Sequence, residues 1–214
     1  LSLRMFRPLE RGVIKGSDNG LLESEEGQEN LRAARALIRH IVEMARPRSD
    51  ELVYGVIGAP AQASIKNQHA LIEAAREVME SVMICSQPFS VAYGMDWLED
   101  VLVIDIGAGT IDLCRMHGTM PEEGDQITLA TAGDFIDEQL EEQLRGCCEG
   151  AAFTRQMVKR IKEKYSFVAD AAERVLVDLP VEGKPTRFDI TDALRESCRR
   201  IIPPMVDAIH ELVR

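Results

Sequence analysis

The chain has 214 residues, of which 45% are hydrophobic, and a formal net charge of −11. This size allows one large domain or two small ones, and the apolar content is sufficient for a sizeable core. The acidic balance argues against a protein that coats nucleic acid, because such proteins need a basic face. It does not exclude a bound nucleotide, whose phosphates can be held by backbone amides and a metal ion.

The cysteines are odd in number and lack a CxxC spacing, and the four histidines are scattered. We therefore expect neither a disulfide framework nor a structural zinc site, but a reduced, cytosolic context. No run of about 18 apolar residues occurs, so neither a membrane-spanning helix nor direct membrane insertion is expected. The first residue is not Met and no signal-peptide core follows it, which suggests an excerpt of a longer protein.

The first hundred residues alternate between helical and strand patterns. Apolar residues recur at helical spacing after residue 30 until Pro47, and Ser64 is a suitable N-cap for a second helix. In chain order we expect a short strand at 9–14, a helix at 30–46, a strand at 52–57, a helix at 64–79, a strand at 82–85 and a short helix ending near Tyr93.

The second half continues this alternation. Residues 101–106 are nearly all apolar, as in a strand buried on both faces. Further elements are expected as strands at 111–116 and 126–131, helices at 134–145 and 155–168, a hairpin of 174–179 with 186–190 around Gly183, and a C-terminal helix that Pro203 and Pro204 must kink or split. Strands and helices that interleave in this way indicate an α/β fold.

The stretch from Asp105 to Asp112 reads Asp-Ile-Gly-Ala-Gly-Thr-Ile-Asp and carries the strongest chemical signal. A buried strand leads to Asp105, and the chain then turns through residues with little or no side chain. Such residues let backbone amides approach phosphate oxygens, and glycine permits the positive φ that we expect in this turn. Asp105 can hold Mg²⁺ through the hydration shell of the ion. Asp112 and the Thr110 hydroxyl add an acidic and a polar group nearby.

This hairpin is neither of the two common nucleotide loops. It lacks the GKS or GKT of a Walker loop, and a strand follows where a Rossmann GxGxxG needs a helix. The alternative interpretation is an ordinary tight β-hairpin in which the glycines serve turn geometry alone.

Three segments together resemble the superfamily of actins, heat-shock chaperones and sugar kinases. The pattern DxGxGTxD at 105–112 is similar to its second phosphate motif, and 131–137 is similar to the GGDxFD-type segment of bacterial actins. Residues 161–168 resemble the stretch whose Lys and Glu contact the ribose and adenine. The resemblance implies an incomplete actin-like (ribonuclease H-like) ATPase fold, in which 1–100 are the remainder of the first lobe and 101–214 most of the second, with a small subdomain at about 150–190.

Within this superfamily the chain resembles the bacterial actins of magnetosome filaments. The segments that carry this likeness are 56–61, 86–89, 103–110 and 183–185, and the likeness extends from about Arg7 to Arg214. It implies a cytoplasmic filament alongside magnetosomes, formed by self-association with ATP or ADP and Mg²⁺. Paralogous actin-like subunits and magnetosome adaptor proteins are the further partners it implies, and nucleic acid is not among them.

The resemblance also implies a role for individual residues. By position, Asp105 holds the metal, and the phosphates are held by Gly107, Ala108, Gly109 and Thr110. Gln87 and Asp112 are catalytic residues that position the attacking water. The further residues that contact the nucleotide are Gly133, Asp134, Lys162 and Glu163.

The sequence also departs from the family pattern. The opening DxGT phosphate loop and the closing adenosine motif do not occur in these residues, so we expect a middle section with little ATPase activity of its own. Gln87 replaces the Glu that bacterial relatives usually carry; glutamine can orient water but is a negligible base, so slow hydrolysis is expected of a full-length chain. The alternative function is a truncated or non-hydrolysing subunit that co-assembles with or regulates an intact paralogue.

Simpler interpretations stand beside these assignments. Gln87 could cap the short helix before Pro88, and Asp134 could be only an N-cap. Lys162 and Glu163 could be an ordinary solvated helix face.

Overall fold

The computed structural model describes residues 25–118, 120–167, 169 and 173–214. The strand expected at 9–14 lies outside these residues. Contacts group the chain into unit 1, which is 1–130 with 208–214, and unit 2, which is 131–207. The lobe boundary expected between residues 100 and 101 stays a prediction. Helices and strands interleave along both units, which confirms the α/β class.

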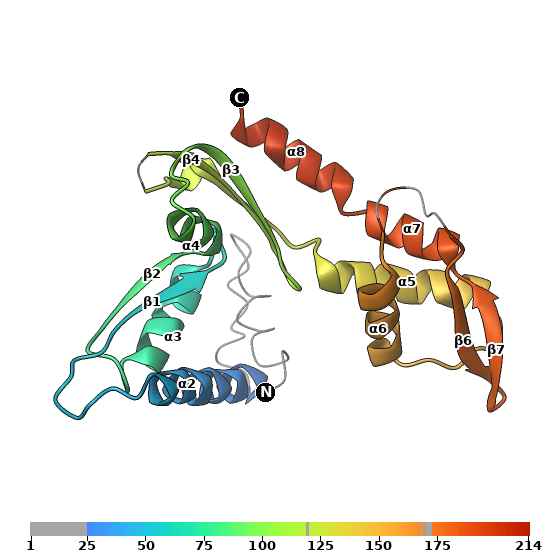
Figure 1. Cartoon of the computed structure of the whole chain (residues 1–214), viewed down its shortest axis with the longest axis horizontal. Coiled ribbons are helices and arrows are strands. Elements are labelled where there is room, and N and C mark those ends of the chain that lie inside the picture. The colour runs from blue at the N-terminus through green and yellow to red at the C-terminus, as the bar shows by residue number, and fades with distance from the viewer. Residues whose placement is uncertain (1–24, 119, 168, 170–172) are drawn as a thin grey trace. The chain divides into compact units, whose positions relative to one another are not determined.

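Unit 1 begins with a parallel two-stranded sheet covered by two helices (Figure 1). The Ser64 hydroxyl accepts a hydrogen bond from the amide of Asn67 and caps the second helix, as predicted. Ile38 and Ala75 form a small core against Ile57 and Val82 of the two strands. The elements are α2 (Glu25–Ala45), β1 (Tyr54–Ala59), α3 (Ile65–Ala75) and β2 (Ser81–Ser86).

A second sheet in unit 1 is antiparallel, in the order β3-β4-β5. Its elements are α4 (Gln87–Gly94), β3 (Glu99–Ile106), β4 (Ile111–His117), the short 3-10 helix η2 (Glu123–Asp125) and β5 (Gln126–Leu129). Ala92 of α4 packs against Val103 and Cys114, so α4 covers one face. The expectation that β3 is buried on both faces is wrong, since Ile104 and Ile106 are 37% and 53% exposed. Successive side chains of a strand point to opposite faces, and α4 covers only one of them.

Unit 2 is a group of helices beside a β-hairpin (Figure 1). Its elements are α5 (Gly133–Cys147), α6 (Arg155–Tyr165), β6 (Leu176–Val181), β7 (Lys184–Asp189) and α7 (Thr191–Arg199), followed by α8 (Ile202–Leu212), whose last residues belong to unit 1. Leu140, Val158 and Leu194, one from each of the first three helices, are fully buried. The predicted split is confirmed: both prolines lie in the first turn of α8, where an amide donor is not needed.

Candidate functional site

The hairpin at Asp105 to Asp112 forms as predicted. Asp105 lies directly opposite Asp112 in the β3–β4 pair, and residues 107–110 connect the strands. Directly opposed residues share a face of the sheet, and alternation places both carboxylates on the face that carries Val103 and Cys114. Since α4 packs on that face, the two acidic side chains point to the same side of the sheet as α4.

The glycines of this turn serve close approach and not an unusual backbone angle. The glycines with positive φ in the described chain are Gly118, Gly150 and Gly183, so the positive φ expected in the turn is wrong. The Gly107 amide donates to the Thr110 carbonyl oxygen at 2.9 Å, and a Cβ on Gly107 would lie 3.2 Å from that oxygen. A side chain at Gly107 would therefore need the turn to open by a few tenths of an ångström.

Asp105 is the acidic group of the hairpin that has no partner in the part of the chain that the structure describes. Among the described residues it makes no ion pair and no side-chain hydrogen bond, and burial, followed by the charge of Asp112, raises its pKa. Two adjacent carboxylates, one of them unpartnered, suit a hard cation. No three His, Cys, Asp or Glu side chains in the described part gather into a metal site. Asp105 would hold a hydrated Mg²⁺ through the water ligands of the ion, a form of coordination that this ion accepts.

Asp112 is occupied differently, because it is 1% exposed and accepts three hydrogen bonds. The Thr110 hydroxyl donates to Oδ2 at 2.8 Å. The Thr128 hydroxyl and the Ala61 amide donate to Oδ1 at 2.6 and 2.7 Å. The carboxylate therefore fixes the end of the turn, the third strand of the sheet and the loop after β1 relative to one another.

Gln62 strengthens the same junction, and the sequence analysis did not single it out. Its side-chain Nε2 donates to the Gln126 carbonyl at 3.1 Å, and its Oε1 accepts from the Thr128 amide at 3.3 Å. Its backbone amide also donates to the Thr128 hydroxyl at 2.9 Å. The amide side chain thus forms hydrogen bonds with the backbone of β5 like those that a neighbouring strand would form. Its place directly after the segment 56–61 is the one sequence signal that could have pointed to it.

Gln87 is the first residue of α4 and is half-buried. The helix is capped by Ser86, whose hydroxyl accepts from the Phe89 amide at 3.4 Å, so the interpretation of Gln87 as the cap is wrong. Its Cγ lies 3.4 Å from the position of a Cβ built on Gly58. A side chain at Gly58 of β1 would therefore lie in van der Waals contact with Gln87.

The remaining expected residues, Gly133, Asp134, Lys162 and Glu163, lie in unit 2. Ala132 occupies the N-cap position of α5, so Asp134 is not the N-cap; it is a buried residue of the first turn. Lys162 of α6 reaches back to α5, where its Nζ donates to the Gly133 carbonyl at 2.7 Å. Glu163 is exposed and lies 3.8 Å from Lys159, an ordinary helix-surface pair.

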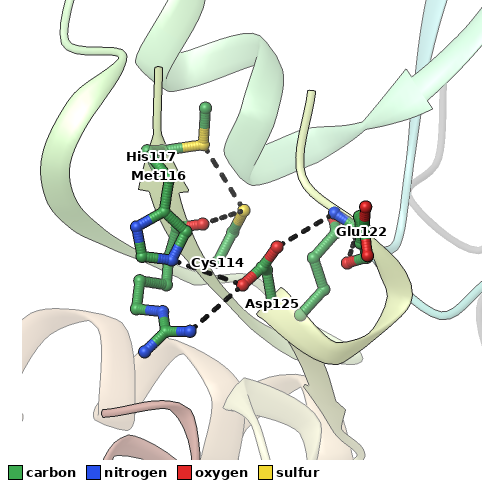
Figure 2. Close-up of polar contacts among 7 residues, drawn as sticks. Cys114, Met116, His117, Glu122 and Asp125 are labelled. Carbon is green, nitrogen blue, oxygen red and sulfur yellow. Dashed lines mark hydrogen bonds and ion pairs between the residues drawn. The ribbon is translucent and has the colours of Figure 1, made fainter. Parts of the chain in front are cut away.

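A polar cluster fixes the approach to β5 (Figure 2). The Asp125 carboxylate accepts from the Glu122 amide at 3.1 Å and from Arg115 at 3.3 Å, and it lies 3.4 Å from His117 Nε2. The hydrogen bond from the Glu122 backbone, followed by Arg115 and His117, holds the pKa of Asp125 below its ordinary value. The cluster orders the turn that places Gln126 and the strand after it.

The five cysteines are free thiols. Burial raises the pKa of Cys114 to about 11, and burial together with Cys147 raises that of Cys148 to about 12. Both stay protonated and unreactive at neutral pH. In the described part, no helix is both long and apolar enough to cross a membrane.

Comparison with curated proteins identifies three similar sequences, and no family model matches the chain. The actin-like protein MamK of Magnetospirillum gryphiswaldense is 34% identical over 97% of this chain and 55% of its own length. MamK of Paramagnetospirillum magneticum is 34% identical over 97% of this chain and 57% of its length. A MamK-like protein of the same organism is 28% identical over 92% and 56%. The chain thus spans about half the length of the curated relatives it matches.

Solved structures give the same result. A MamK double helical filament superposes with a TM-score of 0.84 at 34% identity, covering 89% of this chain and 59% of that one. A non-polymerising MamK mutant bound to AMPPNP gives 0.71 at 33% identity, covering 97% and 61%. An MreB protein of Spiroplasma citri bound to ADP gives 0.71 at 19% identity, covering 86% and 57%, which supports the fold alone. The expected actin-like fold, incomplete in these residues, is confirmed.

Proposed function

The chain belongs to the bacterial actin-like family that includes MamK, and on that premise we propose that it acts in a cytoskeletal filament whose subunits bind ATP with Mg²⁺. The observation that carries this proposal is the hairpin, where Asp105 has no partner within the described part of the chain while the opposite carboxylate of Asp112 accepts three hydrogen bonds. A turn that ends in one free carboxylate suits a phosphate-bound cation. The relatives captured with AMPPNP and ADP support the same nucleotide class.

In this proposal the backbone amides of Ala108, Gly109 and Thr110 bind phosphate oxygens. Gly107, whose amide already donates to the Thr110 carbonyl, closes the turn around them. When bound, Mg²⁺ neutralises phosphate charge, and Asp105 orients its water ligands. Gln87 orients the attacking water by hydrogen bonding and cannot remove its proton, so hydrolysis is slow.

The proposed role of Asp112 follows from its contacts. Its oxygens already accept from three donors, so it positions the site by holding Thr110 and the loop at Ala61 in place. In unit 2, Gly133 and Asp134 line the nucleotide, and Lys162 and Glu163 contact its sugar and base.

The cellular role proposed is that of MamK-type filaments. The chain would self-associate in the cytoplasm alongside magnetosomes and organise or segregate them, with paralogous actin-like subunits and adaptor proteins as further partners. The filament-forming relatives support self-association, and the MamK-like protein of Paramagnetospirillum magneticum shows that a related protein can occur beside a MamK.

Sedimentation of the full-length protein with ATP, ADP or no nucleotide, measured together with phosphate release, tests this function. We expect ATP and Mg²⁺ to increase the pelleted fraction and phosphate to appear slowly. Gln87→Glu should release phosphate faster, because glutamate adds a base to the same position. A pelleted fraction that is the same with ATP, ADP and no nucleotide, together with no phosphate release, would contradict the proposal.

A further inference from the structure

A buried ion pair joins α5 to α6 in unit 2. The Lys162 ammonium lies 2.7 Å from Oδ1 of Asp137, and the two side chains are 15% and 1% exposed. The same ammonium donates to the Gly133 carbonyl at 2.7 Å. Gly133 and Asp137 are four residues apart on α5, so one lysine spans the first turn of the helix.

Burial of the two charges is unfavourable for stability. Removing them from water costs several kcal/mol per ion, and their mutual attraction offsets this cost only when the geometry is good. A neighbouring ion pair already links the same helices at the surface, where Arg155 lies 3.1 Å from Glu138. What the buried pair adds is a fixed position for one ammonium group.

An ammonium group has three N–H donors. The Gly133 carbonyl accepts one of them, the Asp137 carboxylate lies at ion-pair distance, and Lys162 makes no other hydrogen bond to a described residue. The 15% of the Lys162 side chain that is exposed leaves a way for a remaining donor to meet a ligand. The hydrogen bond and the ion pair together fix the position of the ammonium group.

We propose that Asp137 is a positioning residue for nucleotide selection: its ion pair holds the Lys162 ammonium so that a remaining N–H meets a hydroxyl group of the ribose. This inference rests on the proposed binding of ATP. Asp137 does not touch the nucleotide and acts only through Lys162. The site then favours ribonucleotides, because a sugar without that hydroxyl leaves a charged donor unpaired.

Two matched variants separate positioning from simple stabilisation. Asp137→Asn keeps the shape of the side chain but removes its charge, so the Lys162 ammonium loses its ion pair. Glu138→Gln removes the charge of the next residue, whose ion pair with Arg155 is half exposed and joins the same helices. If Asp137→Asn does not fold, the double variant Asp137→Asn/Lys162→Met removes both partners and leaves no unpaired buried charge.

Lysine methylation with formaldehyde and a borohydride reports on the ammonium directly. We expect Lys162 to react slowly in the wild type and in Glu138→Gln and faster in Asp137→Asn. The exposed Lys184 serves as an internal reference, read by peptide mass spectrometry. Equal reactivity of Lys162 in the wild type and in Asp137→Asn would overturn the positioning.

The decisive test compares the dissociation constants of ATP, 2′-deoxy-ATP and 3′-deoxy-ATP, each with Mg²⁺, for the full-length protein. The wild type and Glu138→Gln should prefer ATP to one deoxy form by about tenfold, and Asp137→Asn should lose most of that preference. Weaker binding of all three nucleotides by one common factor in Asp137→Asn would overturn this inference but leave the proposed function intact. A wild type that binds none of them would instead contradict the proposed function itself.

Discussion

Asp112 and Asp105 lie opposite each other in one strand pair but differ in burial and in hydrogen bonding. Asp112 is almost fully buried and accepts three hydrogen bonds, whereas Asp105 is only partly buried and has no side-chain hydrogen bond or ion pair among the described residues. The difference lies in the neighbours that the fold delivers: Ala61 and Thr128 reach Asp112 from 51 and 16 residues away. One carboxylate thus holds the site together, and the other is available to a ligand.

Replacing Asp112 with alanine should be strongly destabilising. The hydroxyls of Thr110 and Thr128 and the Ala61 amide would lose their acceptor in a buried place, which we expect to lower the free energy of unfolding by about 3 kcal/mol. Urea unfolding measures this change. Asp207→Ala, at an exposed position of α8, is the control and should stay within about 0.5 kcal/mol of the wild type.

Replacing Asp105 with asparagine should act in the opposite direction. Burial and the charge of Asp112 raise the pKa of Asp105, so its ionisation costs free energy in the folded chain. That cost is absent below the ordinary pKa of the carboxyl group, grows as the pH rises through the ordinary and then the raised value, and is complete above it. At pH 7 without Mg²⁺, Asp105→Asn should therefore have a higher Tm than the wild type.

The same Asp105→Asn protein should gain less stability from Mg²⁺ with ATP than the wild type does, because the negative charge that holds the hydrated metal is lost. Thermal unfolding with and without the ligand measures both effects, and Asp207→Asn is the matched control. A variant that is less stable than the wild type at pH 7 and is stabilised by the ligand as much as the wild type would contradict the role given to Asp105.

Single residues also mark the limit of sequence reasoning. The run from Asp105 to Asp112 identified the hairpin, because short side chains and two acids at this spacing have few other uses. The partners of Asp112 could not be predicted, since a contact across 51 residues leaves no local pattern. The same holds for Gln62, because its side-chain hydrogen bonds to the β5 backbone depend on the edge of β5 lying beside it.

At the scale of elements, the β6–β7 hairpin shows that a local sequence signal can be sufficient to predict a turn. Glu182 and Gly183 form its two-residue turn with φ values of 49° and 79°, the left-handed pair that tight hairpins require. The sequence predicted this turn from Gly183, and predicted the break between α7 and α8 from the adjacent prolines. Both signals act through the backbone of the residue itself, so tertiary contacts cannot override them.

Gly183→Ala should destabilise this hairpin by about 1 kcal/mol, because an alanine in the left-handed region strains the backbone. A Cβ at Gly183 meets no atom within 4 Å, so the whole effect would come from that strain. Glu182→Asn should be neutral or stabilising, since asparagine tolerates positive φ. Chemical denaturation of both variants tests the pair. An alanine variant as stable as the wild type would refute the strain argument.

At the scale of the molecule, β3 shows why the sequence did not predict how many faces of a strand are covered. Its apolar run predicted two covered faces, but Ile104 and Ile106 are exposed in the described chain because α4 covers one side only. The order of the elements and the actin-like class were nevertheless predictable, because motifs at fixed spacing identify the connections of a fold. The chain matches its curated relatives over about half of their length, so activity and assembly are properties to be tested on the full-length protein.

The central claim is that the Asp105 hairpin binds the phosphates and metal of a nucleotide. Isothermal titration of the protein with ATP, in the presence and absence of Mg²⁺, tests it most directly. We predict saturable binding that depends on Mg²⁺ and weakens at least tenfold in Asp105→Ala, a difference of about 1.4 kcal/mol. Binding of equal strength without Mg²⁺, or an unchanged affinity in Asp105→Ala, would contradict the account.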